Sequence, residues 1–272
     1  MDTISGTLDK MRSRLAGAEV EYALPLGDRE LPLNRYLGHP LVLRYLGEIR
    51  CVACGRKTAK SFNRGYCYPC MRSLARCDLC IVKPELCHHA AGTCREPEWG
   101  LAHCMQPHCV YLANSSGIKV GITRQTQVPT RWIDQGAKQA LPIFEVSSRH
   151  LAGLLEVLLK RHVADRTDWR ALLKGEAADV DLAAKRDELL SLCRADVARL
   201  AAGDGVVPLE EAQPLTLRYP VLEYPAKVAS LSFDKTPEVG GRLMGIKGQY
   251  LMFDRGVINV RKFAGYRVEV AA

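Results

Sequence analysis

The sequence predicts an α+β protein with three kinds of parts. These are a cysteine-rich module, a small antiparallel sheet flanked by helices, and a small β-barrel or sandwich. Ten of the 11 cysteines lie between Cys51 and Cys109. Apolar residues recur at helical spacing within residues 151–202, and short apolar runs bounded by Gly, Asn and Pro occupy much of the rest. A chain of 272 residues, 47% of them hydrophobic, is long enough for two or three small cores.

These patterns divide the chain into four expected regions. They are an N-terminal helix with strands, the cysteine-rich region, a hairpin core with its following helices, and a C-terminal β domain, over residues 1–50, 51–107, 108–204 and 205–272. In the first region we expect a short helix over residues 1–18. Strand-like runs follow at 20–24 and 41–46, separated by Gly-containing turns.

The chain carries no sign of export or membrane insertion. No apolar run reaches the roughly 18 residues of a transmembrane helix. The N-terminus, MDTISGTLDKMRSRL, is charged and lacks the apolar stretch of a signal peptide. We therefore expect a cytoplasmic protein with no membrane partner. Because the cytoplasm is reducing, we expect the clustered cysteines to bind metal rather than to form disulfides.

The first cysteines form two matched pairs, CVAC and CYPC, with 12 residues between them. Two such turns can direct four thiolates at one tetrahedral Zn²⁺. We therefore predict a structural zinc site with the ligands Cys51, Cys54, Cys67 and Cys70. A redox-active CxxC is the alternative, but two matched pairs fit zinc better.

A second group of cysteines follows and predicts another zinc site, whose ligand set the spacing leaves open. Any four of these residues would suffice: Cys77, Cys80, Cys87, Cys94 and Cys104. Our preferred ligands are Cys77, Cys80, Cys94 and Cys104, and Cys87 is the main alternative to one of them. The alternative is that some of these are buried free thiols, as we expect of Cys109.

A β-hairpin follows the cysteines. Apolar runs at 110–113 and 118–122 flank Asn-Ser-Ser-Gly, whose Asn and Gly tolerate the backbone of a tight turn. Residues 130–140 read as a short helix capped by Thr130. We expect a third strand at 141–147, a strongly apolar helix from Leu151 to Asp165 and a second amphipathic helix over 181–202.

Glu156 interrupts the apolar run of the first of these long helices. A carboxylate there must reach solvent, a cation or a metal, because unpaired burial is costly. The alternative is a solvated Glu156 that pairs with Lys160 at i,i+4.

The C-terminal region reads as a series of strands. Strand-like runs occur at 215–219, 226–233, 249–253, 257–261 and 266–270. The Gly-rich segment 240–250 favours a bulged strand pair over a phosphate-binding loop. The N-terminal strands could complete this unit, so that both ends of the chain share one β domain.

Basic residues are concentrated near the first cysteines. The net charge is +8, and the run from Arg50 to Arg76 has seven Lys or Arg, three aromatic rings and no acid. Cationic side chains neutralise phosphates, and flat rings stack on bases. We predict nucleic-acid contacts, DNA or RNA, from Arg56, Lys57, Lys60, Arg64 and Arg124. The alternative is a solvated basic face on a small zinc module.

The stretch VYLANSSGIKVGITRQTQVPTR, read with Glu156, resembles the core of the GIY-YIG nucleases. Tyr111 stands at the Tyr of the first motif, and Lys119 replaces the Tyr of the second. Arg131 matches the helical Arg and Glu156 the metal-binding Glu. The resemblance covers residues 108–175; it lacks the Gly-Ile of the first motif and has Gln135 where many members carry a His.

This resemblance implies an endonuclease that hydrolyses phosphodiesters with one Mg²⁺ or Mn²⁺ ion. Glu156 would hold the ion, and Arg131 would stabilise the phosphate as charge builds up. Tyr111 would orient or deprotonate the attacking water, assisted by Lys119. The alternatives are a nucleic-acid-binding module without catalysis and a zinc-stabilised scaffold for protein partners.

Over most of its length from about residue 40, the chain also resembles a bacterial family of unknown function. The shared segments are CVACGRKT, GYCYPC, GTCREPEWG, VYLANSSGIKVGITR, PTRWIDQGA and GIKGQYL followed by GVINVRK. This resemblance implies an organisation and no activity.

Overall fold

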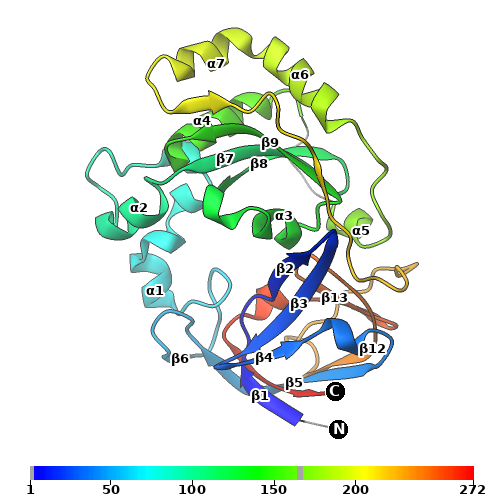
Figure 1. Cartoon of the computed structure of the whole chain (residues 1–272). Coiled ribbons are helices and arrows are strands. Elements are labelled where there is room, and N and C mark those ends of the chain that lie inside the picture. The colour runs from blue at the N-terminus through cyan, green and yellow to red at the C-terminus, as the bar shows by residue number, and fades with distance from the viewer. Residues whose placement is uncertain (1–2, 164–167) are drawn as a thin grey trace.

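Strands from the two ends of the chain pair in the largest of three antiparallel sheets (Figure 1). The computed structural model describes residues 3–163 and 168–272, and within them it has these three sheets and seven α-helices. The order in the large sheet is β1 (Thr3–Thr7), β15 (Tyr266–Ala271), β5 (Pro40–Arg50), β12 (Glu238–Lys247), β13 (Tyr250–Phe253) and β14 (Gly256–Asn259), with β6 (Lys57–Thr58) on β5.

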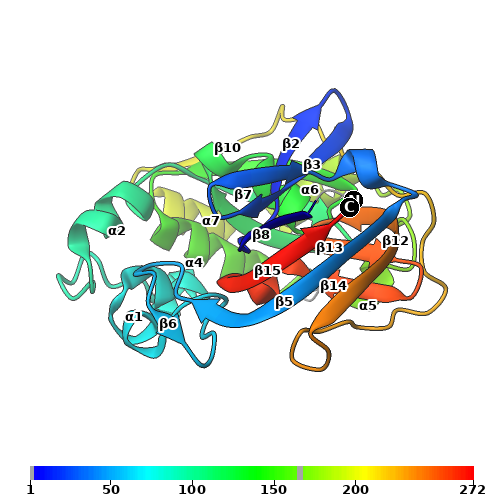
Figure 2. The ribbon, with the colours of Figure 1, turned by 90° about the horizontal axis from the view of Figure 1, so that it is seen from below.

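This sheet confirms that the N-terminal and C-terminal strands share one β unit. The two terminal strands β1 and β15 lie side by side, with Thr3 opposite Ala271 (Figure 2). In the described part of the chain the sheet does not close into a barrel, since β1 and β14 are its two edges. The Gly-rich segment is the bulged strand expected, with a register shift between Leu243 and Gly245.

Two local expectations at the ends of the chain are wrong. The helix expected over residues 1–18 is replaced by β1 and by β2 (Arg12–Ala16). Pairing with β15 overrides local preference here, and Gly6 lies so close to Leu26 that a Cβ would meet its carbonyl oxygen at 2.3 Å. The strand expected over 226–233 is an irregular segment with one isolated bridge, Ser230 to Val257.

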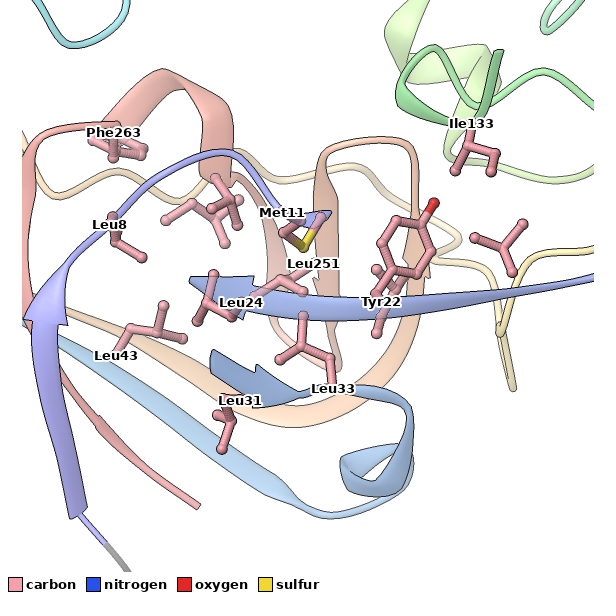
Figure 3. Packing of buried hydrophobic residues seen from close by; sticks show 14 of the residues in the cluster. Leu8, Met11, Tyr22, Leu24, Leu31, Leu33, Leu43, Ile133, Leu251 and Phe263 are labelled. Carbon is pink, nitrogen blue, oxygen red and sulfur yellow. The ribbon is translucent and has the colours of Figure 1, made fainter. Parts of the chain in front are cut away.

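A three-stranded sheet packs over the large one and encloses the first core. It contains β2, β3 (Glu19–Leu26) and β4 (Arg29–Pro32), followed by the 3-10 turn η1 (Asn34–Tyr36). Leu24 and Leu33 meet Leu43 and Leu251 in the space between the sheets (Figure 3). Ile133, from the middle of the chain, joins the same cluster, so the β unit and the hairpin region share a core.

The middle of the chain forms the third sheet. Its order is β10 (Val206–Pro208), β9 (Gln139–Val146), β7 (His108–Asn114) and β8 (Ile118–Arg124), with β11 (Leu215–Thr216) also on β9. The predicted hairpin is therefore confirmed as β7 and β8, and the predicted third strand as β9. The strands β10 and β11, which we assigned to the C-terminal unit, pair instead with this sheet.

Alternate residues of β7 face two different cores, as the two-residue period of a strand requires. Tyr111 faces the first core, which includes Trp132 of α3 (Thr130–Asp134). Val110 and Leu112 face the second core, which α4 (Arg149–Leu159) covers. The remaining helices of the described middle region are α5 (Trp169–Leu172), α6 (Leu182–Leu192) and α7 (Arg194–Ala201), and the 3-10 turn η5 (Gln125–Gln127) precedes α3.

The helices differ from expectation mainly at their ends. Thr130 is the first helical residue of α3, with Pro129 at the N-cap position, so Thr130 is not the cap. The helix α4 begins two residues early because Ser148 caps it through Leu151 N, and it ends at Leu159. The expected end at Asp165 lies outside the described residues. The single helix expected over 181–202 is broken at Cys193.

The cysteine-rich region consists of short turns and two short helices between the sheets. They are α1 (Tyr68–Ser73), η2 (Ala75–Cys77), η3 (Leu79–Ile81), η4 (Pro84–Leu86) and α2 (Pro97–His103); a further 3-10 turn, η6 (Val260–Phe263), follows β14. Within residues 3–163 and 168–272, every helix is too short or too polar to span a lipid bilayer.

Candidate active site and metal centres

The first four cysteines converge as a metal site requires. The sulfur atoms of Cys51, Cys54, Cys67 and Cys70 all lie within 4.8 Å of one another. The Cys54 and Cys67 sulfurs are 3.8 Å apart. Thiolates at about 2.3 Å from a tetrahedral zinc ion would be separated by roughly that distance. The cluster is therefore compatible with a bound zinc ion.

The backbone around this cluster favours thiolate over thiol at Cys51. Burial of Cys51 opposes ionisation, but backbone N–H groups of Cys67, Cys54 and Ala53 point at its sulfur. Together they lower the pKa of Cys51 to about 6. Four thiolate ligands would leave no open coordination position on a bound zinc ion, so the cluster suits a structural rather than a catalytic centre.

In the second cysteine group, the four cysteines that share one cavity are not the four of our preferred ligand set. Cys80, Cys87, Cys94 and Cys104 line one small cavity. Cys77 does not line it; its side chain hydrogen-bonds with Asn63 instead, near the first cluster. Cys109 lies in the first core, 5% exposed, as expected of a packing thiol.

Three of the four candidate catalytic residues line one open cleft. Lys119, Arg131 and Glu156 come from β8, α3 and α4, and the cleft between them has a volume of about 770 Å³. These residues are up to 37 positions apart in the chain, so only the fold brings them together. The arrangement gives a carboxylate and two cationic side chains access to the same bound molecule.

Tyr111 lies directly beneath this cleft rather than on its surface. It is 0% exposed, and its hydroxyl donates a hydrogen bond to Gln135 Oε1 at 3.1 Å. Gly121 lies opposite it on β8 and lines the cleft; a Cβ on Gly121 would come within 2.7 Å of the Tyr111 hydroxyl. Only a glycine at 121 leaves the hydroxyl this close to the cleft.

The surroundings keep Tyr111 neutral. Burial is the largest effect and raises the pKa of Tyr111 to about 12. The charge of Arg131 and its hydrogen bond to the phenol oppose this rise, whereas the Glu156 carboxylate adds to it. Both residues therefore lie close enough to act on the Tyr111 hydroxyl.

Glu156 has features of both interpretations of the sequence: it is paired with Lys160, and it is also accessible from the cleft. Its side chain is 12% exposed and forms an i,i+4 ion pair with Lys160 at 3.3 Å. It nevertheless lines the cleft with Arg131 and Arg149. The carboxylate is therefore directed at the cleft while remaining paired on its own helix.

The cleft is strongly basic. Eight Lys or Arg side chains line it, and three acids accompany them: Lys10, Arg64, Arg76, Lys119, Arg124, Arg131, Arg149 and Arg261, with Asp9, Asp134 and Glu156. Asp134 is occupied by an ion pair with Lys10 at 2.9 Å. A cluster of cations with so few counter-charges suits a polyanion.

The residues that we assigned to nucleic-acid contact divide into two groups. Arg64 and Arg124 line the cleft. Arg56, Lys57 and Lys60 are exposed on the first zinc module and do not line it.

The sequence did not single out Arg149 and Arg261. Burial lowers the pKa of Arg261, and the positive charges of Arg131 and Arg64 lower it further, so these three guanidinium groups lie near one another. Burial likewise lowers the pKa of Arg149, whose Nε has no hydrogen-bond partner among the described residues. The only local signal for Arg149 is its place directly after the capping Ser148.

The comparisons place the chain in a family without assigning it an activity. The model of a protein family of unknown function, DUF2797, matches residues 38–268. No curated protein and no solved structure matches the chain. The match covers well over half of the sequence, so the chain belongs to the DUF2797 family.

Proposed function

We propose that this protein is a metal-dependent endonuclease with a GIY-YIG-like site in the basic cleft. The observation that supports this most is the convergence of Lys119, Arg131 and Glu156 on one cleft, with Tyr111 beneath Gly121. The hairpin, the short helix and the later helix supply these residues in the order that the resemblance implies.

The acid content of the cleft suits a single hard cation. Mg²⁺ and Mn²⁺ prefer oxygen ligands, and Mg²⁺ is often bound through one or two carboxylates plus water. Asp134 is engaged with Lys10 and with Gln249. Glu156 is itself paired with Lys160, but it lines the cleft with Arg131 and is the carboxylate that the nuclease resemblance assigns to the ion. A bound ion there would polarise the phosphate and lower the pKa of a coordinated water.

The protein's own residues would then orient the substrate. Arg131 donates hydrogen bonds to the non-bridging phosphate oxygens as negative charge accumulates. The neutral Tyr111 hydroxyl, held by Gln135, orients the attacking water. Lys119, on β8, neutralises the same phosphate group.

The second candidate is a nucleic-acid-binding module without catalysis. It is favoured by the complete burial of Tyr111 and by the ion pair between Glu156 and Lys160. In that case the cleft would grip the phosphate backbone through its arginines alone.

One experiment separates these candidates. Purified full chain is incubated with single-stranded, duplex and branched DNA and RNA in Mg²⁺ or Mn²⁺, alongside Glu156→Gln and Glu98→Gln. Glu98 is exposed on α2 and does not line the cleft, so it is a matched control. We expect Glu156→Gln to reduce the cleavage rate by about 100-fold or more, with binding unchanged.

The outcomes are distinct. Cleavage that Glu156→Gln removes and Glu98→Gln retains supports the enzyme. Salt-dependent binding without cleavage by the unmodified chain, under every metal and substrate, selects the binding module. Absence of both binding and cleavage overturns both candidates and selects the protein scaffold.

A further inference from the structure

Four cysteines outside the first zinc cluster surround a cavity the size of a single ion. Cys80, Cys87, Cys94 and Cys104 line a space of about 10 Å³, which is on the scale of one water molecule. They come from η3, from the residue after η4, from the loop before α2 and from the end of that helix. Helix α2 approaches so closely that a Cβ at Gly100 would lie 3.3 Å from the Cys94 sulfur.

The segment around this cavity has no apolar core of its own. Over residues 75–107, all of which are described, the buried apolar side chains apart from cysteines are those of Ala75 and Pro84. Three of its large apolar side chains, Ile81, Trp99 and Met105, are half-buried, and four are exposed: Leu79, Val82, Leu86 and Leu101. About thirty residues of short turns without a core ordinarily need a metal or disulfides to hold one conformation.

Asp78 and His88 offer a competing set of ligands. With Cys80 they provide three ligand atoms within 4.8 Å of one another, a spacing that no three of the four cysteine sulfurs reach. Both residues already have structural partners, however. Asp78 pairs with Arg95 at 2.6 Å and accepts from Cys80 N, and His88 Nδ1 lies 2.8 Å from Thr93 Oγ1. A four-cysteine site therefore requires the cysteine side chains to rotate toward the cavity, including Cys94, whose sulfur lies 3.5 Å from Glu96 O, whereas Asp78 and His88 can keep their present partners.

The cavity wall is attached directly to the helix that carries Glu156. Arg149 N donates to Cys104 O at 2.7 Å, and Arg149 also donates to Ile81 O at 2.6 Å. One turn later, Gly153 lies against the backbone of Pro84 and Glu85. Whatever fixes segment 79–104 therefore also fixes the position of α4.

We propose that Cys80, Cys87, Cys94 and Cys104 bind a second zinc ion, which holds this segment against α4. Cys77 has no part in the site, and Asp78 and His88 support it from outside. The zinc site does not depend on the proposed nuclease activity.

Zinc content per chain tests the proposal. We expect two zinc ions per unmodified full chain by elemental mass spectrometry, one for Cys87→Ser and for Cys94→Ser, and two for the control Cys77→Ser. One ion in the unmodified chain, or two retained in Cys87→Ser and Cys94→Ser, overturns the site. Loss of one ion in His88→Gln but not in Cys94→Ser overturns the ligand set in favour of Asp78, Cys80 and His88.

If the cysteine variants do not fold, ¹¹³Cd NMR of the unmodified chain still tests the second zinc site. After exchange of zinc for cadmium-113, we expect two ¹¹³Cd resonances, both in the range of four-thiolate sites. A single resonance, or a second one in the range of mixed nitrogen and oxygen ligands, contradicts the proposal. In folded Cys87→Ser, amide exchange in α4 should be at least about tenfold faster than in Cys77→Ser, a shift of roughly 1.4 kcal/mol in opening free energy.

Discussion

The Tyr111 hydroxyl donates its hydrogen bond to Gln135 across the floor of the cleft, at a donor–acceptor distance of 3.1 Å. If Tyr111 orients the attacking water, Tyr111→Phe should lower the cleavage rate by about 100-fold. It should also lower the free energy of unfolding by about 1 kcal/mol, because Gln135 loses its donor. Cleavage assays and urea denaturation measure the two effects.

Tyr219→Phe is the matched control for this substitution. Tyr219 is a half-buried tyrosine whose hydroxyl donates to Ala137 O at 2.8 Å, and it does not line the cleft. We expect the same loss of stability without a loss of cleavage. Equal cleavage by Tyr111→Phe and Tyr219→Phe would remove Tyr111 from the mechanism.

The protonation state of Tyr111 gives a separate prediction about pH. Burial raises its pKa to about 12, so the phenol is neutral throughout pH 6–9. The ratio of cleavage rates between the unmodified chain and Tyr111→Phe should then be constant across this range. A ratio that rises about tenfold per pH unit would instead identify the phenolate as the general base.

The three guanidinium groups of Arg64, Arg131 and Arg261 predict where the phosphate backbone binds. Arg261→Ala should weaken binding across all sequences and reduce the slope of log affinity against log salt by about one. Arg56→Ala, on the exposed zinc module outside the cleft, should change this slope less. A larger effect of Arg56→Ala would move the binding surface to that module. Fluorescence anisotropy at several salt concentrations measures both.

Features set by local sequence were predictable. The backbone preferences of Asn and Gly allow the tight turn at residues 114–117. The strands β7 and β8 on either side of it pair as the predicted hairpin. The two matched CxxC pairs predicted that Cys51, Cys54, Cys67 and Cys70 converge, and their sulfurs do lie within 4.8 Å of one another.

Features set by distant contacts were not predictable. The N-terminal segment is a strand because β15, more than 250 residues away, supplies its partner. The place of Cys87 at the cavity that Cys80, Cys94 and Cys104 also line depends on how η3 and η4 pack together and how η4 packs on α4, which spacing does not encode. Arg261 approaches Arg131 only because the C-terminal β unit packs beside the hairpin sheet.

Lys247 predicts a pH-dependent stability. Its ammonium group is buried, donates to Gly175 O at 3.1 Å and lies over the rings of Tyr219 and Tyr224. Burial lowers the pKa of Lys247 to about 8, below the value of about 10.5 in the unfolded chain. Between these values the unfolded chain binds a proton that the folded chain does not, so stability rises with pH.

The comparison with Lys247→Met isolates this effect from other titrating groups. The unmodified chain should gain roughly 3 kcal/mol relative to Lys247→Met between pH 8 and pH 10.5, and nothing below pH 8. The exposed Lys227→Met should show no such difference. A constant gap between the unmodified chain and Lys247→Met over this range would mean that the ammonium is not desolvated.

Gly153 lets α4 pack directly against η4, and this contact predicts an unusual response to alanine. Gly→Ala inside a helix normally stabilises it by about 1 kcal/mol. At Gly153 a Cβ would lie 2.4 Å from Glu85 N and 2.6 Å from Pro84 C, which are backbone atoms that cannot rotate away. Overpacking of this kind costs about 1–3 kcal/mol, so Gly153→Ala should destabilise the protein and push α4 away from η4.

This displacement would also move Glu156, which lies one turn further along α4. We therefore expect Gly153→Ala to lower the thermal midpoint of unfolding and the metal-dependent cleavage rate together. Gly203→Ala is the control, since nothing lies within 4 Å of a Cβ there and its backbone does not demand glycine. Scanning calorimetry that finds Gly153→Ala as stable as Gly203→Ala would show that segment 79–104 is not clamped on α4, and the link from the second metal centre to Glu156 would be lost.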